Sequence, residues 1–177
     1  RKLAKADTIS KLMQSKKSLK YAKFLIEQPL IFKKEIIFKN KSKKVIMVHA
    51  GIPPNLSLEN CFDLNKEFQV ALKKNPKRIL KKVFNNPFSK FSKKMSKIDR
   101  IIFFANALTR IRACNHKGEI DFNFKGRINE IPKKLNAWFN FENSIISGNS
   151  QLIFGHWAAI KGETKKKDIF GLDTGCV

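Results

Sequence analysis

The chain has 177 residues, enough for one domain with a sizeable core, and its 42% hydrophobic content excludes general disorder. The formal net charge is +23, from 37 Lys and Arg residues against 14 Asp and Glu residues. The sequence holds no apolar run long enough to span a membrane, so we expect no membrane partner.

The N-terminal third predicts a helix followed by two short strands. Apolar residues recur at helical spacing over residues 1–27, and Pro29 ends that stretch. Residues 35–39 predict a short strand, and residues 41–44 predict a charged turn. The apolar, β-prone run at 45–48 predicts a buried strand.

Helices are predicted in the middle of the chain. Helical spacing over 58–74 places Leu58, Phe62, Phe68 and Leu72 on an inner face. A second helix follows Pro76 and contains Ile79, Leu80 and Val83. The polar stretch 85–97 predicts an exposed connection. The apolar stretch 101–108 fits a helix or a strand equally well.

The C-terminal third predicts strands separated by irregular segments. Residues 119–124 alternate apolar and polar, as a strand with one buried face does. Residues 126–150 predict irregular structure, and strands are expected at 151–154 and 168–172. Strands mixed with helices, without a strict βαβ rhythm, favour the α/β class in the broad sense, including α+β.

Most of the positive charge is Lys, which weakens a nucleic-acid interpretation. Only six of the 37 cationic residues are Arg, and the Lys residues are scattered among Asn, Ile and Phe, which A/T-rich codons also encode. Drift in base composition therefore explains the charge better than a dedicated nucleic-acid surface. We identify no basic face with interleaved aromatic residues, so we expect no specific nucleic-acid partner.

The three Cys residues carry no disulfide signature. They are widely spaced and odd in number, without a CxxC pair. Reduced thiols in a cytoplasmic protein are the expectation.

Two of the three histidines share a local context. His49 follows the predicted strand 45–48, and His156 follows the predicted strand 151–154. A side chain at a strand end is rigidly held and still faces a cleft, as a metal ligand must. Each His taken alone is also compatible with a half-buried structural role. His116 lies in a turn signal and is expected to be exposed.

Several motifs in series resemble one enzyme family. They are VIMVHAGI at 45–52, FANALTRIRAC at 104–114, WF at 138–139, FGHWA at 154–158 and LDTGC at 172–176. In this order and spacing they resemble the symmetrical diadenosine tetraphosphatases, which are calcineurin-like metallophosphoesterases. The resemblance implies a two-layer β-sandwich flanked by helices, with two divalent metal ions between the sheet ends.

The resemblance also implies an incomplete set of metal motifs. The family's GDxHG, GDxxxRG and GNHD motifs do not occur in this sequence. We therefore expect residues 1–177 to be the C-terminal portion of the domain, without a short C-terminal tail. Only His49 and His156 match metal positions, both at the second metal, and no catalytic residue is assigned. The dinuclear site would hold Mn²⁺ or Co²⁺, with Mg²⁺, Fe or Zn as alternatives.

The expected substrate is a dinucleoside polyphosphate, cleaved symmetrically to two ADP. Arg110 and Arg112 lie two residues apart, so in an extended segment both would point the same way and suit phosphate oxygens.

Four further residues have weaker assignments. Asn106 and Thr109 could orient an oxygen or the nucleoside. Trp138 could stack on adenine or belong to the core, and Asp173 could orient an imidazole or cap a turn.

Two other functions stay open. A serine/threonine-type phosphoprotein phosphatase shares the metal core, although the NALTRIR stretch favours the tetraphosphatase. A basic nucleic-acid-binding protein without catalysis is the alternative from another class. We expect this chain alone to be inactive, and the sequence does not determine its oligomeric state.

Overall fold

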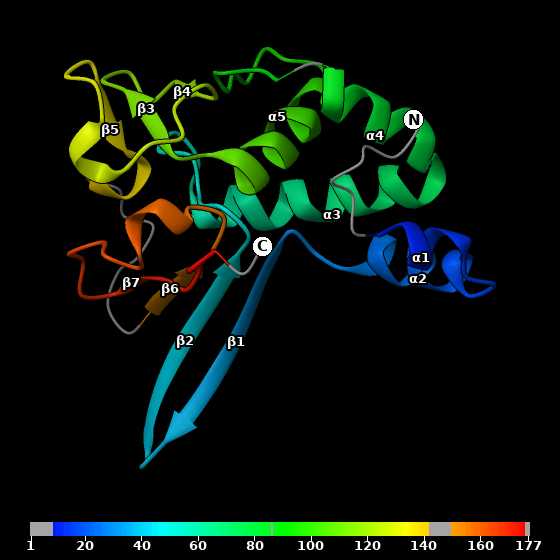
Figure 1. Ribbon diagram of the computed structural model, residues 1–177, viewed down its shortest axis with the longest axis horizontal. Coiled ribbons are helices and arrows are strands. Elements are labelled where there is room, and N and C mark those ends of the chain that lie inside the picture. The colour runs from blue at the N-terminus through cyan, green and yellow to red at the C-terminus, as the bar shows by residue number, and fades with distance from the viewer. Residues whose placement is uncertain (1–8, 86, 142–149, 176–177) are drawn as a thin grey trace.

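The computed structural model describes residues 9–85, 87–141 and 150–175 (Figure 1). Within these residues the chain forms a four-stranded sheet, a three-stranded sheet and five α-helices. The predicted mixed α/β class is confirmed.

The larger sheet has the strand order β1-β2-β6-β7. Its strands are β1 (Ile31–Phe38), β2 (Lys41–Val48), β6 (Ser150–Phe154) and β7 (Ile169–Gly171). β1 runs antiparallel to β2, whereas β6 and β7 run parallel to their neighbours. The carboxyl ends of β2, β6 and β7 therefore meet at one edge of the sheet.

The β1–β2 hairpin is longer than the sequence predicts, and it projects from the body of the molecule (Figure 1). The predicted turn at 41–44 is wrong, because these residues are the start of β2. The reversal occurs at Lys39 and Asn40, whose φ angles are 48° and 59°. Two consecutive left-handed residues make a two-residue loop that matches strand twist. The Lys residues at the start of β2 interrupt the apolar pattern from which a strand is predicted.

The two faces of this sheet differ in exposure. Ile46, Val48 and Leu152 are buried toward the helices. On the other face Phe32 pairs with Met47, Met47 with Ile153, and Ile153 with Phe170. Register partners share a face, so these four side chains form an apolar band across the sheet. Three of them are substantially exposed: Phe32 46%, Met47 45% and Phe170 37%.

Three helices pack against one another beside this sheet. α3 (Leu58–Lys74) has the predicted bounds, and α4 (Pro76–Asn85) follows it. Ser57 caps α3 by accepting a hydrogen bond from Asn60 N. On α3 the side chains of Phe68 and Leu72 are buried, as predicted.

The ambiguous stretch 101–108 is helical, within α5 (Lys97–Arg110). All eight of its residues are buried, so the helix is apolar on every side and lacks helical periodicity. The connection between α4 and α5 has neither helix nor strand in its described residues, as predicted. Its apolar side chains nevertheless pack against the core: Phe88, Phe91 and Met95.

The predicted helix over 1–27 is divided in two. α1 (Ser10–Gln14) and α2 (Ser18–Glu27) are separated at Ser15, whose backbone is extended and whose hydroxyl accepts from Lys17 N. Residues 1–8 lie outside the described part. Neither helix buries a residue, and Leu19 is 76% exposed.

The smaller sheet has the order β4-β3-β5, with β3 (Ala113–Asn115), β4 (Ile120–Asp121) and β5 (Leu135–Ala137). The predicted strand at 119–124 is shorter than expected. The Asp121 carboxylate accepts hydrogen bonds from Asn123 N and Phe124 N, and this turn ends β4.

The region predicted as irregular contains regular structure. It includes β5 and two 3₁₀ turns, Ile128–Glu130 and Trp138–Asn140. Residues 142–149 lie outside the described part. A third turn, Ala158–Ile160, follows β6.

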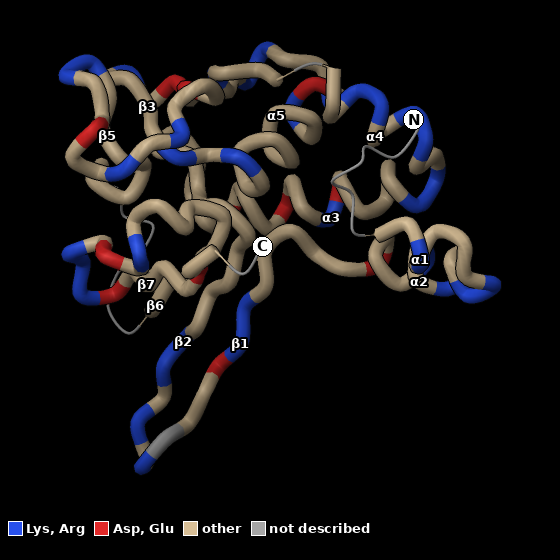
Figure 2. Tube along the Cα trace, viewed as in Figure 1, with Lys and Arg blue, Asp and Glu red and all other residues tan. Residues whose placement is uncertain are grey.

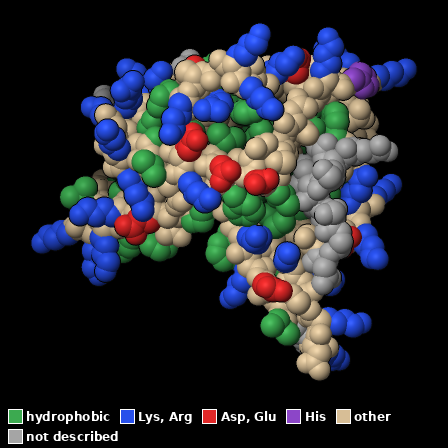
Figure 3. Space-filling view, turned by 180° about the vertical axis from the view of Figure 1, so that it is seen from behind, with side chains coloured by type: hydrophobic (Ala, Val, Ile, Leu, Met, Phe, Trp, Pro, Cys, Tyr) green, Lys and Arg blue, Asp and Glu red, His purple; other side chains and the backbone are tan. Residues whose placement is uncertain are grey.

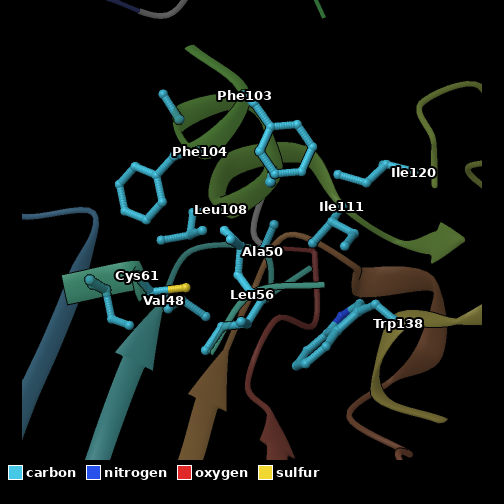
Figure 4. Packing of buried hydrophobic residues seen from close by; sticks show 14 of the residues in the cluster. Val48, Ala50, Leu56, Cys61, Phe103, Phe104, Leu108, Ile111, Ile120 and Trp138 are labelled. Carbon is cyan, nitrogen blue, oxygen red and sulfur yellow. The ribbon is translucent and has the colours of Figure 1, made fainter. Parts of the chain in front are cut away.

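The core joins the larger sheet, the helices and the smaller sheet. Val48 and Ala50 from the end of β2, Cys61 from α3 and Leu108 from α5 meet there (Figure 4). Ala50 N donates to Leu108 O at 2.7 Å, which ties the end of β2 to the end of α5. Burial raises the pKa of the Cys61 and Cys114 thiols to about 12, and both thiols are free.

Gly51 is required by the packing of Trp138. A Cβ atom at Gly51 would lie 2.5 Å from Cε2 of Trp138. A Cβ atom at Gly155 would meet nothing nearer than His49 O at 3.5 Å, an ordinary contact. The packing therefore requires a glycine at position 51, whereas position 155 has room for a Cβ atom.

We predict that Gly51→Ala destabilises the protein by about 1–3 kcal/mol, the usual effect of overpacking a core. Urea unfolding followed by Trp fluorescence measures the change in the free energy of unfolding. Gly155→Ala is the matched control and should cause a much smaller loss or a slight gain. Equal destabilisation by both variants would contradict the packing role of Gly51.

Candidate metal and substrate site

The two strand-end histidines lie in contact. His49 Nε2 and His156 Nδ1 are 3.2 Å apart, and the ring centroids are separated by 5.0 Å. The backbones are joined as well, since Gly155 N donates to His49 O at 2.8 Å. Parallel pairing of β2 with β6 brings together two residues that are 107 positions apart.

A surface depression of about 380 Å³ opens at this edge of the sheet. Besides the two histidines it is lined by residues of β2, of β6 and of the segment after β7: Met47, Val48, Ile153, Phe154, Gly155, Leu172, Asp173 and Thr174. Its wall therefore includes part of the exposed apolar band. The sequence analysis did not identify Met47 as a site residue. Met47 and His49 are two residues apart in an extended segment, so their side chains are expected on the same face of the sheet.

The geometry of the pair fits two ligands of one metal ion. Metal–nitrogen bonds of about 2.0–2.1 Å place two ligand nitrogens of a tetrahedral ion about 3.3 Å apart. The observed 3.2 Å agrees with that separation. Among the described residues no group of three or more His, Cys, Asp or Glu side chains could hold an ion. Two imidazoles alone are fewer ligands than a protein metal site usually has.

The electrostatics favour a neutral His156. Burial lowers its pKa to about 4, with further lowering from the positive charges of Arg112 and His49. A hydrogen bond with the Arg110 backbone and the Asp173 carboxylate act in the opposite direction and raise the pKa. Near neutral pH the imidazole is therefore deprotonated, which is the form that binds a metal.

Arg112 supports the backbone of His156. Its Nη2 donates to His156 O at 3.3 Å. His156 has φ of 66°, a left-handed conformation that is uncommon for a residue with a side chain. Burial lowers the pKa of Arg112, and the nearby Asp173 carboxylate raises it. Arg112 therefore lies in the site and stabilises the turn that presents the imidazole.

Arg110 lies elsewhere. The prediction that Arg110 and Arg112 belong to one extended segment is wrong, because Arg110 is the last residue of α5. Its guanidinium lies 5.7 Å from the ring centroid of Phe84 on α4. The helix end separates the directions of the two side chains, so the Arg112 guanidinium lies beside the histidines, whereas Arg110 contacts His156 through its backbone.

Asn106 and Thr109 are built into α5. Asn106 is 0% exposed and its amide donates to Ile102 O. The Thr109 hydroxyl donates to Ala105 O at 2.6 Å. Both side chains bond the preceding turn of their own helix, so the structure does not present them in the depression.

Trp138 and Asp173 occupy different environments. Trp138 is 2% exposed and packs edge-on against Phe139 and Phe154, so its burial supports the core alternative. The Asp173 carboxylate accepts from Gly175 N at 2.9 Å and lines the depression. It therefore caps a turn and also acts electrostatically on His156. His116 is exposed in a turn, as predicted.

Curated relatives match almost the whole chain. The protein named "Bis(5'-nucleosyl)-tetraphosphatase, symmetrical" of Coxiella burnetii (strain RSA 331 / Henzerling II) is 32% identical over 96% of this chain. Proteins of the same name from Pseudomonas putida (strain ATCC 700007) and Marinomonas sp. (strain MWYL1) are 30% and 32% identical over 99% of it. This chain is a homologue of these tetraphosphatases. No family model matches the chain.

The similarity extends over only part of each relative. The chain spans 56%, 59% and 62% of the lengths of these three proteins. None of the described helices combines the length and apolar character needed to cross a bilayer.

We predict that Arg112→Gln raises the pKa of His156 above its present value of about 4, because removing a nearby positive charge favours the protonated imidazole. NMR titration of the His156 ring protons in metal-free protein measures this pKa. Arg110→Gln is the control and should leave it unchanged, because that guanidinium faces Phe84. An unchanged pKa in Arg112→Gln would refute the assigned electrostatics.

His156 should also make stability depend on pH. Its folded pKa of about 4 lies below the ordinary value of 6.5, so the unfolded chain binds a proton first as the pH falls. The stabilisation that comes from keeping the folded imidazole neutral is therefore fully present above pH 6.5, and it is lost progressively as the pH falls to about 4. Thermal unfolding at pH 7.5 and pH 5 should show a larger fall in Tm for the native protein than for His156→Gln, which lacks the titrating imidazole.

Proposed function

We propose that this chain forms part of a metal-dependent hydrolase that cleaves diadenosine tetraphosphate symmetrically to two ADP. The observation that carries the proposal is the convergence of His49 and His156 at the ends of adjacent parallel strands. The names of its relatives supply the reaction. A cytoplasmic location is proposed with it, since the two described Cys residues are free thiols.

In this proposal the two histidines hold one of two divalent ions, Mn²⁺ or Co²⁺, with Mg²⁺, Fe or Zn as alternatives. A dinuclear centre would lower the pKa of the attacking water and offset charge on the phosphoryl oxygens. His49 is exposed and supplies Nε2, whereas the more enclosed His156 supplies Nδ1. Arg112 fixes the backbone turn of His156 and adds positive charge beside the depression.

A phosphoprotein phosphatase is less well supported, because the matched relatives reported above carry the tetraphosphatase name. A net charge of +23 also suits a polyanionic substrate, since it raises the rate of encounter. Comparing turnover of diadenosine tetraphosphate with that of a phosphopeptide distinguishes these two activities.

We predict that His49→Ala or His156→Ala lowers the ADP-forming activity at least tenfold. The test uses a protein of the relatives' length that contains this chain. Each substitution deletes one of two ligands, so metal content by mass spectrometry should fall by about one ion per chain. His116→Ala is the matched control, because His116 is exposed in a turn. Normal turnover with a full metal content in either ligand variant would refute the assignment.

We also predict that the 177-residue chain by itself binds divalent metal weakly and does not hydrolyse diadenosine tetraphosphate. Two imidazoles give an incomplete ligand set, and the described residues contain no group of three His, Cys, Asp or Glu side chains that could hold an ion. Manganese-dependent release of ADP by the purified chain would contradict this prediction.

A further inference from the structure

A groove on α4 gathers positive charge that the histidine site does not use. Its volume is about 530 Å³, and the described residues that line it are cationic or amide: Asn75, Lys77, Arg78, Lys81, Lys82 and Asn85. Figure 2 shows the basic positions along α4, and Figure 3 shows Lys and Arg side chains spread widely over the opposite view of the molecule. The groove differs from that general surface because its cations share one wall.

No acidic residue is close to α4 in the sequence. Between Glu67 and Asp99 the chain has ten Lys and Arg residues and no Asp or Glu. The ion pairs within the described part of the chain involve Lys66, Lys90 and Lys97, none of which lies on α4. Positive charges that lack acidic partners are free to bind an anionic ligand.

Part of the apolar side of α4 is already occupied. Ile79 and Val83 are 2% and 8% exposed and belong to the core. A helix that binds a bilayer surface must insert a broad apolar face, whereas α4 leaves only Leu80 and Phe84 exposed, at 41% and 64%. The exposed side therefore suits a soluble polyanion better than a lipid surface.

An exposed aromatic ring lies on α4 next in sequence to a residue that lines the groove. Phe84 precedes Asn85 and is 64% exposed. Arg110 lies 5.7 Å from its ring centroid and adds another cation. A cationic track beside an exposed aromatic ring is the usual arrangement for binding single strands, because phosphates follow the charge and bases stack on the ring.

We infer that the α4 groove binds single-stranded nucleic acid through its phosphate backbone, without sequence preference, and that Phe84 stacks on a base. The helix is about 15 Å long, so the ligand is a short stretch of strand. The groove shares no lining residue with the histidine depression. The inference does not depend on the proposed hydrolase, and it identifies a basic face that the sequence analysis did not find.

Two variants of equal charge test this inference. In the groove variant Lys77, Arg78, Lys81 and Lys82 become Gln, and in the control variant Lys125, Lys133, Lys134 and Lys167 become Gln. Each lowers the formal net charge of +23 by four, and the control positions are all exposed. Fluorescence anisotropy with a 5′-fluorescein dT20 oligonucleotide gives Kd at several KCl concentrations, and circular dichroism checks folding.

We expect the groove variant to bind at least tenfold more weakly than the control variant. The slope of log K against log salt should also shrink by about 3, since each phosphate contact on a single strand contributes about 0.7. Phe84→Ala leaves every charge in place and should weaken binding about tenfold with an unchanged slope. If the groove variant does not fold, Phe84→Ala alone still tests the inference.

Three outcomes overturn the inference. Equal losses in both charge variants would mean that only bulk charge binds the oligonucleotide. Native affinity in the groove variant would place the binding elsewhere. Retained oligonucleotide binding, with loss of binding to phosphatidylserine vesicles, would assign the groove to lipid headgroups.

Discussion

The parallel pairing of β2 with β6 is the constraint on which the candidate site depends. It sets Met47 opposite Ile153, two residues before His49 and three before His156. The Gly155-to-His49 backbone hydrogen bond then continues the contact past the strand ends. A register shift of one residue would reverse the faces of β6 and separate the imidazoles. The burial of Ile46 and Leu152 on the opposite face opposes such a shift.

Local sequence signals predicted the parts of this arrangement that depend on near neighbours. The spacing of apolar residues over 58–74 predicted α3, and the short apolar runs before His49 and His156 predicted the inner strands. The hairpin was mispredicted because its strands extend beyond the core and β2 begins with the Lys-rich residues 41–44. The helix α5 was ambiguous because burial on all sides removes the periodicity that distinguishes a helix from a strand.

Side-chain directions depended on tertiary contacts and were less predictable. Arg110 and Arg112 are close in sequence, but the end of α5 falls between them and sends one to Phe84 and the other to His156. Asn106 occurs in a motif-like stretch, yet it lies in the part of α5 over 101–108 that is buried on every side. Trp138 is fixed by its contact with Gly51, which no local rule reveals.

The apolar band on the larger sheet bears on how the site could be completed. Met47 and Ile153 belong both to this band and to the wall of the histidine depression. Under the proposed function, a protein segment that packs on the band would bury Phe32 and Phe170 and would end beside His49. The same contact would exclude water from the depression in which the proposal places a metal ion. Apolar burial and metal binding would thus be coupled, so that metal affinity would depend on packing against this sheet.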